Sequence, residues 1–324
     1  MSETSANSAR LSPEPLPGNI ISVQPGSGFC YRLELRWGIF RRWWLKRFRP
    51  GYVQRMAATR VGSDAGAPHE ILDPRDLKFC RNLCQCDWPN GQDPFAWRER
   101  IPLARWGLAE VLLMGTPLLA AAVALGFTPW WYASLVPLVL LGWVLWFFRD
   151  PTRQVSGEPG LVISPADGKV VEIVRLDYHE FIDGPAVRIG IFLNIFNVHI
   201  NRAPLDCRVI RLRYEPGKFL NALNPQSALE NENMWIGLEE QAFPHRRLVV
   251  RQIAGAIARR IVCGLRSGEV LERGQKFGMI KLGSRTELIL ADESGLKIET
   301  QVGQHVQAGG TILAKYASTE KSAD

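Results

Sequence analysis

The chain has 324 residues, of which 46% are hydrophobic and 22% charged, a composition that excludes wholesale disorder and a small disulfide-stapled scaffold. Its formal net charge is +7, yet residues 31–60 alone hold nine Lys and Arg against one acid, Glu34. One basic segment therefore sets the charge, which excludes a uniformly basic nucleic-acid-binding protein.

We predict that residues 1–100 form an N-terminal extension of unknown function. Residues 1–27 are rich in Ser, Pro and Gly and contain no apolar run, which predicts a flexible leader without a secretory signal. The cysteines are then expected to be reduced. Cys80, Cys84 and Cys86 form C-x3-C-x-C, but no fourth ligand follows at a familiar spacing, so we predict no metal site.

Residues 35–56 interleave basic and aromatic side chains. Such a segment can stack on bases and contact phosphates of a nucleic acid. It can also lie at a membrane surface, with Trp at headgroup depth and Arg against anionic lipid. We favour the membrane and expect no nucleic-acid partner, because the most apolar part of the chain comes next.

We predict that residues 101–150 form a membrane-anchoring helical hairpin. Residues 107–127 are apolar except for Glu110, and residues 130–148 carry no charge over a length that would cross about 28 Å as a helix. Arginines flank both ends, so the positive-inside rule places both ends in the cytoplasm and the chain in the inner membrane. The alternative is a hairpin buried in a soluble core.

We predict that residues 151–324 form a mainly β domain with few helices, similar to a β-sandwich or barrel-sandwich. This domain is expected on the cytoplasmic side of the membrane. Short β-like runs alternate with Gly, Pro and Asp turns. The expected strands are 169–175, 186–193, 209–214, 248–253, 277–282, 286–290 and 297–300. The last segment, V-G-Q-H-V-Q-A-G-G-T-I-L-A, has the turn–strand rhythm of sandwich folds that carry lipoyl-type groups.

Three local motifs carry residues suited to chemistry. They are S-P-A-D-G-K-V at 164–170, I-F-L-N-I-F-N-V-H-I-N-R-A-P at 191–204, and F-G-M-I-K-L-G-S-R at 277–285. Taken alone, the first and third read as ordinary turns and the second as a strand with one histidine.

In this order, and after F-F-R-D-P-T-R at 147–153, the motifs resemble the phosphatidylserine decarboxylase family. P-G-K-F-L-N-A at 216–222, E-N-E-N at 230–233 and I-A-G-x-I-A-R-R-I at 253–261 extend the resemblance, which covers roughly residues 108–317. The first hundred residues are not explained by it.

The resemblance implies a self-processing lyase of phospholipid biosynthesis. The chain would cut itself between Gly283 and Ser284, leaving chains of residues 1–283 and 284–324, and Ser284 would become a covalent pyruvoyl group. That group would form a Schiff base with phosphatidylserine, release CO2 and yield phosphatidylethanolamine, with no metal. Gly283 suits the cleavage because it lacks a side chain that would block attack.

Asp167 and His199 match family positions near the serine, so the resemblance implies a triad-like set. His199 would accept the Ser284 proton and Asp167 would orient the imidazole. Longer bacterial members carry a second histidine where this chain has Arg202. The chain therefore resembles the short class with G-S-R, and whether His199 serves processing, decarboxylation or both stays open.

Arg202, Lys218 and Arg285 are candidates to bind the substrate phosphate or carboxylate, although a solvated surface cation explains each equally well. The expected partners are a phospholipid, the membrane and the two chains of one precursor. The exact serine phospholipid and a homo-oligomeric state stay open. The competing hypothesis is a non-catalytic membrane-anchored adaptor or carrier, which would keep its full mass of 36.4 kDa.

Overall fold

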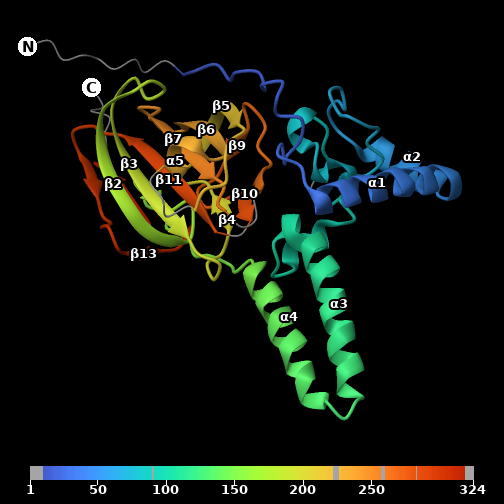
Figure 1. Cartoon of the computed structure of the whole chain (residues 1–324). Helices are drawn as coiled ribbons and strands as arrows, with labels where there is room; N and C mark the ends of the chain where they lie inside the picture. The colour runs from blue at the N-terminus through green and yellow to red at the C-terminus, as the bar shows by residue number, and fades with distance from the viewer. Residues whose placement is uncertain (1–9, 90, 222–225, 257–259, 282, 318–324) are drawn as a thin grey trace, which may run out of the picture. The chain divides into compact units, whose positions relative to one another are not determined.

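The computed structural model describes residues 10–89, 91–221, 226–256, 260–281 and 283–317 (Figure 1). Contacts divide the chain into two units. A β unit combines residues 1–26 with 153–324, and a helical unit spans residues 27–152.

Antiparallel strands build the β unit. Its largest sheet curls and has the order β13-β2-β3-β11-β7-β6-β5-β9, and two smaller sheets have the orders β1-β14-β12 and β4-β10-β8. This confirms the prediction of a mainly β domain, and each of the seven expected runs overlaps a strand. The elements are β1 (Leu161–Ile163), β2 (Gly168–His179), β3 (Gly184–Leu193), β4 (Ile200–Arg202), β5 (Cys207–Glu215), α5 (Ser227–Glu230), β6 (Asn233–Glu240), β7 (Arg247–Ile253), β8 (Arg260–Cys263), β9 (Val270–Leu271), β10 (Lys276–Lys281), β11 (Ser284–Ala291), β12 (Leu296–Ile298), β13 (His305–Val306) and β14 (Ile312–Tyr316).

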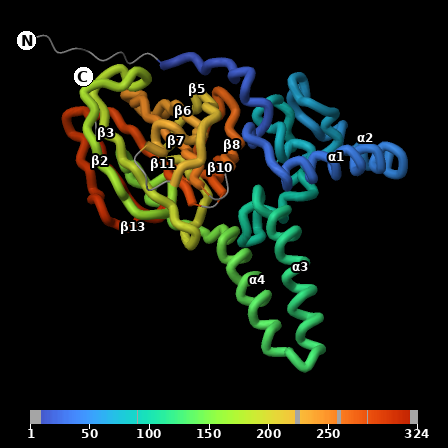
Figure 2. The backbone as a smooth tube through the Cα atoms, in the orientation of Figure 1, coloured from blue at the N-terminus to red at the C-terminus, as the bar shows by residue number. Residues whose placement is uncertain are grey.

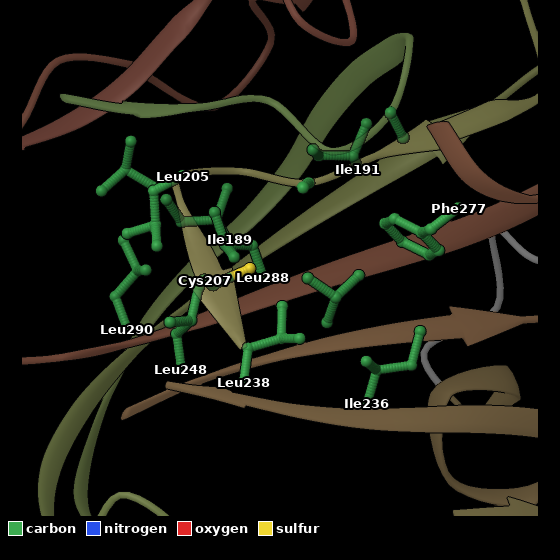
Figure 3. Close-up of a cluster of buried hydrophobic side chains, with 14 of the residues drawn as sticks. Ile189, Ile191, Leu205, Cys207, Ile236, Leu238, Leu248, Phe277, Leu288 and Leu290 are labelled. Carbon is green, nitrogen blue, oxygen red and sulfur yellow. The ribbon is translucent and has the colours of Figure 1, made fainter. Parts of the chain in front are cut away.

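One apolar cluster fills the inside of the curled sheet. Alternate residues of β3, such as Ile189 and Ile191, point into it, as do Leu288 and Leu290 of β11 (Figure 3). Strand alternation sends every second side chain to one face, so the pattern fixes which face of β11 is internal. Ser284 pairs with Leu193, a member of the cluster, and therefore lies on this inner face.

The expected flexible leader is wrong for residues 10–26, whereas residues 1–9 lie outside the described residues. Ile20 and Val23 are buried. The backbone N–H of Glu14 donates to Ile210 O at 2.8 Å, and that of Cys263 donates to Val23 O at 2.9 Å. Residues 10–26 form irregular backbone with turns at 18–19 and 25–26, and their apolar side chains pack on the β unit without the spacing of a helix or a strand.

The helical unit begins with two helices that contain the basic-aromatic segment. Its elements are α1 (Phe29–Phe48), α2 (Pro50–Thr59), η1 (Pro74–Lys78), η2 (Arg81–Leu83), η3 (Ala96–Arg100), η4 (Arg105–Gly107), α3 (Leu108–Gly126), η5 (Trp131–Ser134) and α4 (Leu135–Phe147). Arg41 is buried and binds Asp73 and Asp76, so part of the basic charge expected to face lipid is neutralised internally.

The C-x3-C-x-C thiols lie in a small apolar core of the helical unit. The Sγ of Cys80 donates to Asp76 O at 3.1 Å, and burial raises the pKa of Cys80 to about 12 and that of Cys86 to about 11. Metal binding requires thiolates. Burial therefore favours the protonated form of Cys80 and Cys86, which pack as apolar side chains.

Helix α3 is long and apolar enough to cross a membrane, and it stands alone in this among the described residues. Only 11% of its most apolar window is buried, which disagrees with a hairpin enclosed in a soluble core. One continuous helix was expected over residues 130–148. The structure instead has the 3-10 helix η5 over Trp131–Ser134, followed by the α-helix α4, which begins at Leu135. The two helices approach closely at Gly115, where an added Cβ would lie 3.2 Å from Leu141.

Candidate active site

The pairing of β4 with β10 brings His199 beside Gly283. His199 directly precedes β4, Gly283 follows β10 closely, and Ile200 pairs with Met279. Strand β8 pairs with β10 as well (Figure 2). The N–H of Ile280 donates to His199 O at 3.1 Å, and the N–H of Gly283 donates to Nε2 of His199 at 3.3 Å. Two predicted site residues, 84 positions apart, thus meet at one end of a short antiparallel pair.

The hydrogen bonds of His199 fix its tautomer. A backbone N–H can only donate, so Nε2 must present its lone pair to Gly283. The proton then sits on Nδ1 and is donated to Asn197 O, 2.9 Å away. The ring is buried, with 1% of its surface exposed. This tautomer places an unprotonated ring nitrogen at the N–H of Gly283, one residue before Ser284, where a general base for the Ser284 hydroxyl is needed.

Ser284 is the first residue of β11 and is fully buried. Its Oγ has no hydrogen-bond partner within the part of the chain that the structure describes. A buried hydroxyl without a partner is unfavourable by about 1–3 kcal/mol. Such an unpartnered hydroxyl is unusual in a protein interior and is free to take part in chemistry.

Backbone geometry around the Gly283–Ser284 bond depends on two glycines. Gly283 has φ +65°, in the left-handed region that glycine tolerates best. Gly255 lies against the bond itself, since a Cβ added there would be 1.7 Å from Gly283 O and 2.7 Å from its carbonyl carbon. The I-A-G motif therefore supplies a position where only glycine leaves room for the bond.

Asn231 fixes the segment that contains Gly255. Its Oδ1 accepts the Leu220 N–H at 2.8 Å, and its Nδ2 donates to Leu220 O at 2.8 Å and to Ala254 O at 2.7 Å. The P-G-K-F-L-N-A, E-N-E-N and I-A-G motifs, separated in sequence, are thus joined through one buried amide beside the G-S-R motif.

Asp167 forms an ion pair with Arg153, whose NH2 nitrogen lies 2.7 Å from Oδ2. Its Oδ1 also accepts the N–H of Ala308 at 2.8 Å. Arg153 was expected only to mark membrane topology, as one of the arginines that flank the apolar helices, so its ion pair with Asp167 was not predicted. The Nδ1 proton of His199 goes to a backbone carbonyl in this uncut chain, so an orienting role of Asp167 stays a prediction.

A buried polar cluster adjoins the inner face of β11 and was not predicted. Nδ2 of Asn201 donates to Thr286 Oγ1 at 3.2 Å, and Nε2 of Gln252 donates to Asn201 Oδ1 at 2.9 Å. Thr286 lies two residues beyond Ser284 on the same face. Asn201 stood in a quoted motif, but nothing in the sequence pointed to Gln252.

The three expected substrate-binding cations are placed differently from one another. Arg202 is buried, and its NH1 donates to Gly274 O at 3.0 Å. Lys218 is exposed and pairs with Glu230 at 2.7 Å. Arg285 lies on the sheet face opposite Ser284, where it pairs with Glu172 and Glu287. The structure therefore does not bring Arg285 together with Ser284.

Glu232, in the E-N-E-N motif, is a buried carboxyl group. Its backbone oxygen accepts the N–H of Ala254 at 2.9 Å, and its Oε1 has no hydrogen-bond partner among the described residues. Burial raises the pKa of Glu232 to about 7, against the smaller lowering effects of Tyr214 and Arg260. A titratable group thus lies next to the segment that supports the scissile bond.

Comparison with known proteins agrees with these motifs. The family model described as phosphatidylserine decarboxylase matches residues 140–314. The chain is 51% identical to a phosphatidylserine decarboxylase proenzyme of Rhodopirellula baltica over 241 residues, which cover 74% of this chain and 99% of the relative. It is 43% identical to the proenzyme of Desulfotalea psychrophila over 182 residues, covering 56% of this chain and 83% of that relative. The chain belongs to the phosphatidylserine decarboxylase family.

Proposed function

We propose that this chain is a phosphatidylserine decarboxylase proenzyme that cuts itself between Gly283 and Ser284. One observation carries the proposal: a buried serine with an unpartnered hydroxyl follows a left-handed glycine beside a histidine in its basic tautomer. The family membership supports the same reaction, and its relatives are named proenzymes.

The first step of processing converts an amide into an ester. Ser284 Oγ attacks the carbonyl carbon of Gly283 while His199 Nε2 takes the hydroxyl proton. The C–N bond then breaks, and its nitrogen gains a proton and becomes the free amine of Ser284. Gly255 leaves the carbonyl accessible, and the turn at Gly283 gives the backbone the freedom to rearrange.

The second step separates the two chains. Removal of the Ser284 α-proton expels the ester oxygen, which leaves with residue 283 as a carboxylate. Position 284 becomes dehydroalanine, and water replaces its nitrogen, releasing ammonia. The products are a chain of residues 1–283 and a chain of residues 284–324 that begins with a pyruvoyl group.

The residues around Ser284 fit such a group. The position is fully buried, and the hydroxyl that would be consumed makes no hydrogen bond in the described structure. A pyruvoyl group supplies an electrophilic carbonyl that accepts the electron pair left when CO2 departs from an amino acid. We propose that His199 also holds the proton needed by the product, and that Arg202 and Lys218 contribute positive charge for the lipid headgroup.

Membrane anchoring by a helical hairpin is part of the proposal. Helix α3 has spanning length, and η5 with α4 together reach about 28 Å, near the hydrocarbon thickness. The apolar side chains of both helices are largely exposed, as expected for lipid-facing surfaces. Flanking arginines favour an inner-membrane location with the β unit in the cytoplasm.

Decarboxylation of phosphatidylserine by the purified chain tests the function. Vesicles containing phosphatidylserine should yield CO2 and phosphatidylethanolamine with the wild-type chain and neither with Ser284→Ala. Release of CO2 by Ser284→Ala would exclude Ser284 as the source of the reactive group. A cleaved wild-type chain that leaves phosphatidylserine intact but decarboxylates another serine phospholipid would change the substrate and keep the chemistry.

A further inference from the structure

The helical unit contains a cavity of about 580 Å³ that the catalytic proposal does not use. Its walls come from one side of α1, from η1, from residues 97–105 and from the first turn of α3. These parts of the chain lie in the N-terminal extension and at the start of the membrane-span candidate.

Positive charge dominates the polar part of this wall. The charged residues that line it are Arg41, Arg42, Arg75, Lys78, Arg98 and Arg105, against the acids Glu34 and Asp76. Most of these cations have an acidic partner, as Arg105 has in Glu99 at 2.5 Å.

Arg98 differs from the other cations. Nowhere in the described helical unit does a carboxylate pair with its guanidinium, which lies 4.8 Å from the ring centroid of Phe95 and 5.8 Å from that of Trp97. Burial, together with the nearby charges of Arg105 and Arg75, lowers the pKa of Arg98. Asp73 and Asp93 act more weakly in the opposite direction. The cavity thus holds a half-buried cation that lacks an ion-pair partner among the described residues and that a bound anion would stabilise.

The rest of the wall is apolar and continues into the proposed membrane span. Leu108, Val111 and Leu112 belong to the first five residues of α3, within about 8 Å of its start. Trp37 and Trp97 also line the cavity and are more than half exposed. Tryptophan and arginine at the end of a spanning helix are typical of the headgroup layer of a bilayer.

We propose that this cavity binds the phosphate group of an anionic phospholipid, with the acyl chains along α3. Guanidinium groups bind phosphate through two parallel hydrogen bonds, and Arg98 is the group available for this. The apolar wall favours a lipid over a soluble phosphate. The inference rests on the proposed entry of α3 into the membrane, and it gives the N-terminal extension a role in lipid binding.

Native mass spectrometry of the full-length chain in detergent tests this inference. The probes are phosphatidylglycerol and phosphatidylcholine with equal acyl chains, each added alone, and then inorganic phosphate as a competitor. The wild-type chain should retain phosphatidylglycerol in preference to phosphatidylcholine, and millimolar phosphate should not displace it. Arg98→Gln should weaken phosphatidylglycerol retention roughly fivefold, whereas Arg98→Lys, which keeps the charge but not the two parallel hydrogen bonds, should weaken it by an intermediate factor.

Arg55→Gln is the matched control, because Arg55 is exposed on α2 and does not line the cavity. Equal retention of both lipids by the wild-type chain would overturn the proposal whether or not the variants fold. So would loss of the preference in Arg55→Gln to the same degree as in Arg98→Gln. Displacement of phosphatidylglycerol by inorganic phosphate would also overturn the proposal, because it would indicate a site for a soluble anion.

Processing is read from the same spectra and separates this inference from the catalytic one. Arg98→Gln should still give the chains 1–283 and 284–324. An uncut wild-type chain that retains phosphatidylglycerol would refute the proposed function and leave the lipid site intact.

Discussion

Replacing Gly255 by alanine should slow self-cleavage while leaving the fold in place. The added Cβ would lie 1.7 Å from Gly283 O, whereas close carbon–oxygen contacts are about 3.3 Å or longer. The two atoms must therefore separate by about 1.6 Å. Since the obstructing atom belongs to the backbone, no side-chain rotation relieves the contact, and the scissile carbonyl itself must move.

A displacement of about 1 Å at a reacting centre can cost a factor of about 100 in rate. We therefore expect the half-time of conversion from the 36.4 kDa precursor to the two chains to lengthen at least about 100-fold in Gly255→Ala. The assay follows precursor and products by gel electrophoresis after synthesis of the chain in a cell-free system.

Gly184→Ala is the control, because Gly184 begins β3 in the same unit and an added Cβ there meets nothing within 4 Å. It should process at the wild-type rate. Wild-type processing by a folded Gly255→Ala would refute the argument that this close approach sets the geometry of the scissile bond.

Three further changes test the surroundings of Ser284. His199→Ala should reduce the processing rate about 100-fold or more, because it removes the general base; normal cleavage followed by failure to decarboxylate phosphatidylserine would assign His199 to the later reaction. Asp167→Asn and Arg153→Gln should lower the thermal unfolding temperature to a similar degree, because each breaks the same ion pair. Processing that is slower in Asp167→Asn but not in Arg153→Gln would support an orienting role of Asp167. The pKa of Glu232 is about 7 in the folded state and 4.5 ordinarily, so between these pH values the folded state binds more protons than the unfolded state. The free energy of unfolding should therefore fall by about 3 kcal/mol as the pH rises from 4.5 to 7. Glu232→Gln should remove this pH dependence of the unfolding free energy in the Ser284→Ala background, and an unchanged dependence would place the titration elsewhere.

Local patterns predicted the strands, because a strand depends on a short stretch of chain, whereas cleavage between Gly283 and Ser284 was implied by the resemblance to the family and stays a prediction. β-like runs between Gly, Pro and Asp turns indicated seven strands, and the ordered set of motifs, rather than the G-S-R turn by itself, pointed to Ser284. The role of Gly255 could not be predicted, since it depends on the contact of two loops 28 residues apart that only the folded sheet brings together.

Pairings between distant polar groups were also beyond the sequence. Arg153 followed an apolar segment and was interpreted as a topology marker, yet it neutralises Asp167. The buried leader illustrates the same limit, because Ile20 and Val23 pack without helical or strand periodicity. Residues such as Arg98 acquire meaning only from neighbours supplied by several separate segments.

The mass of the mature protein is the sharpest test of self-cleavage at Ser284. Purified wild-type protein should consist of a chain ending at residue 283 and a chain starting at residue 284, the latter lighter by one ammonia than simple hydrolysis would give. Its first position should lack an amine and react with hydroxylamine. A folded, uncut chain of 36.4 kDa, or a small chain that begins with ordinary serine, would contradict the account.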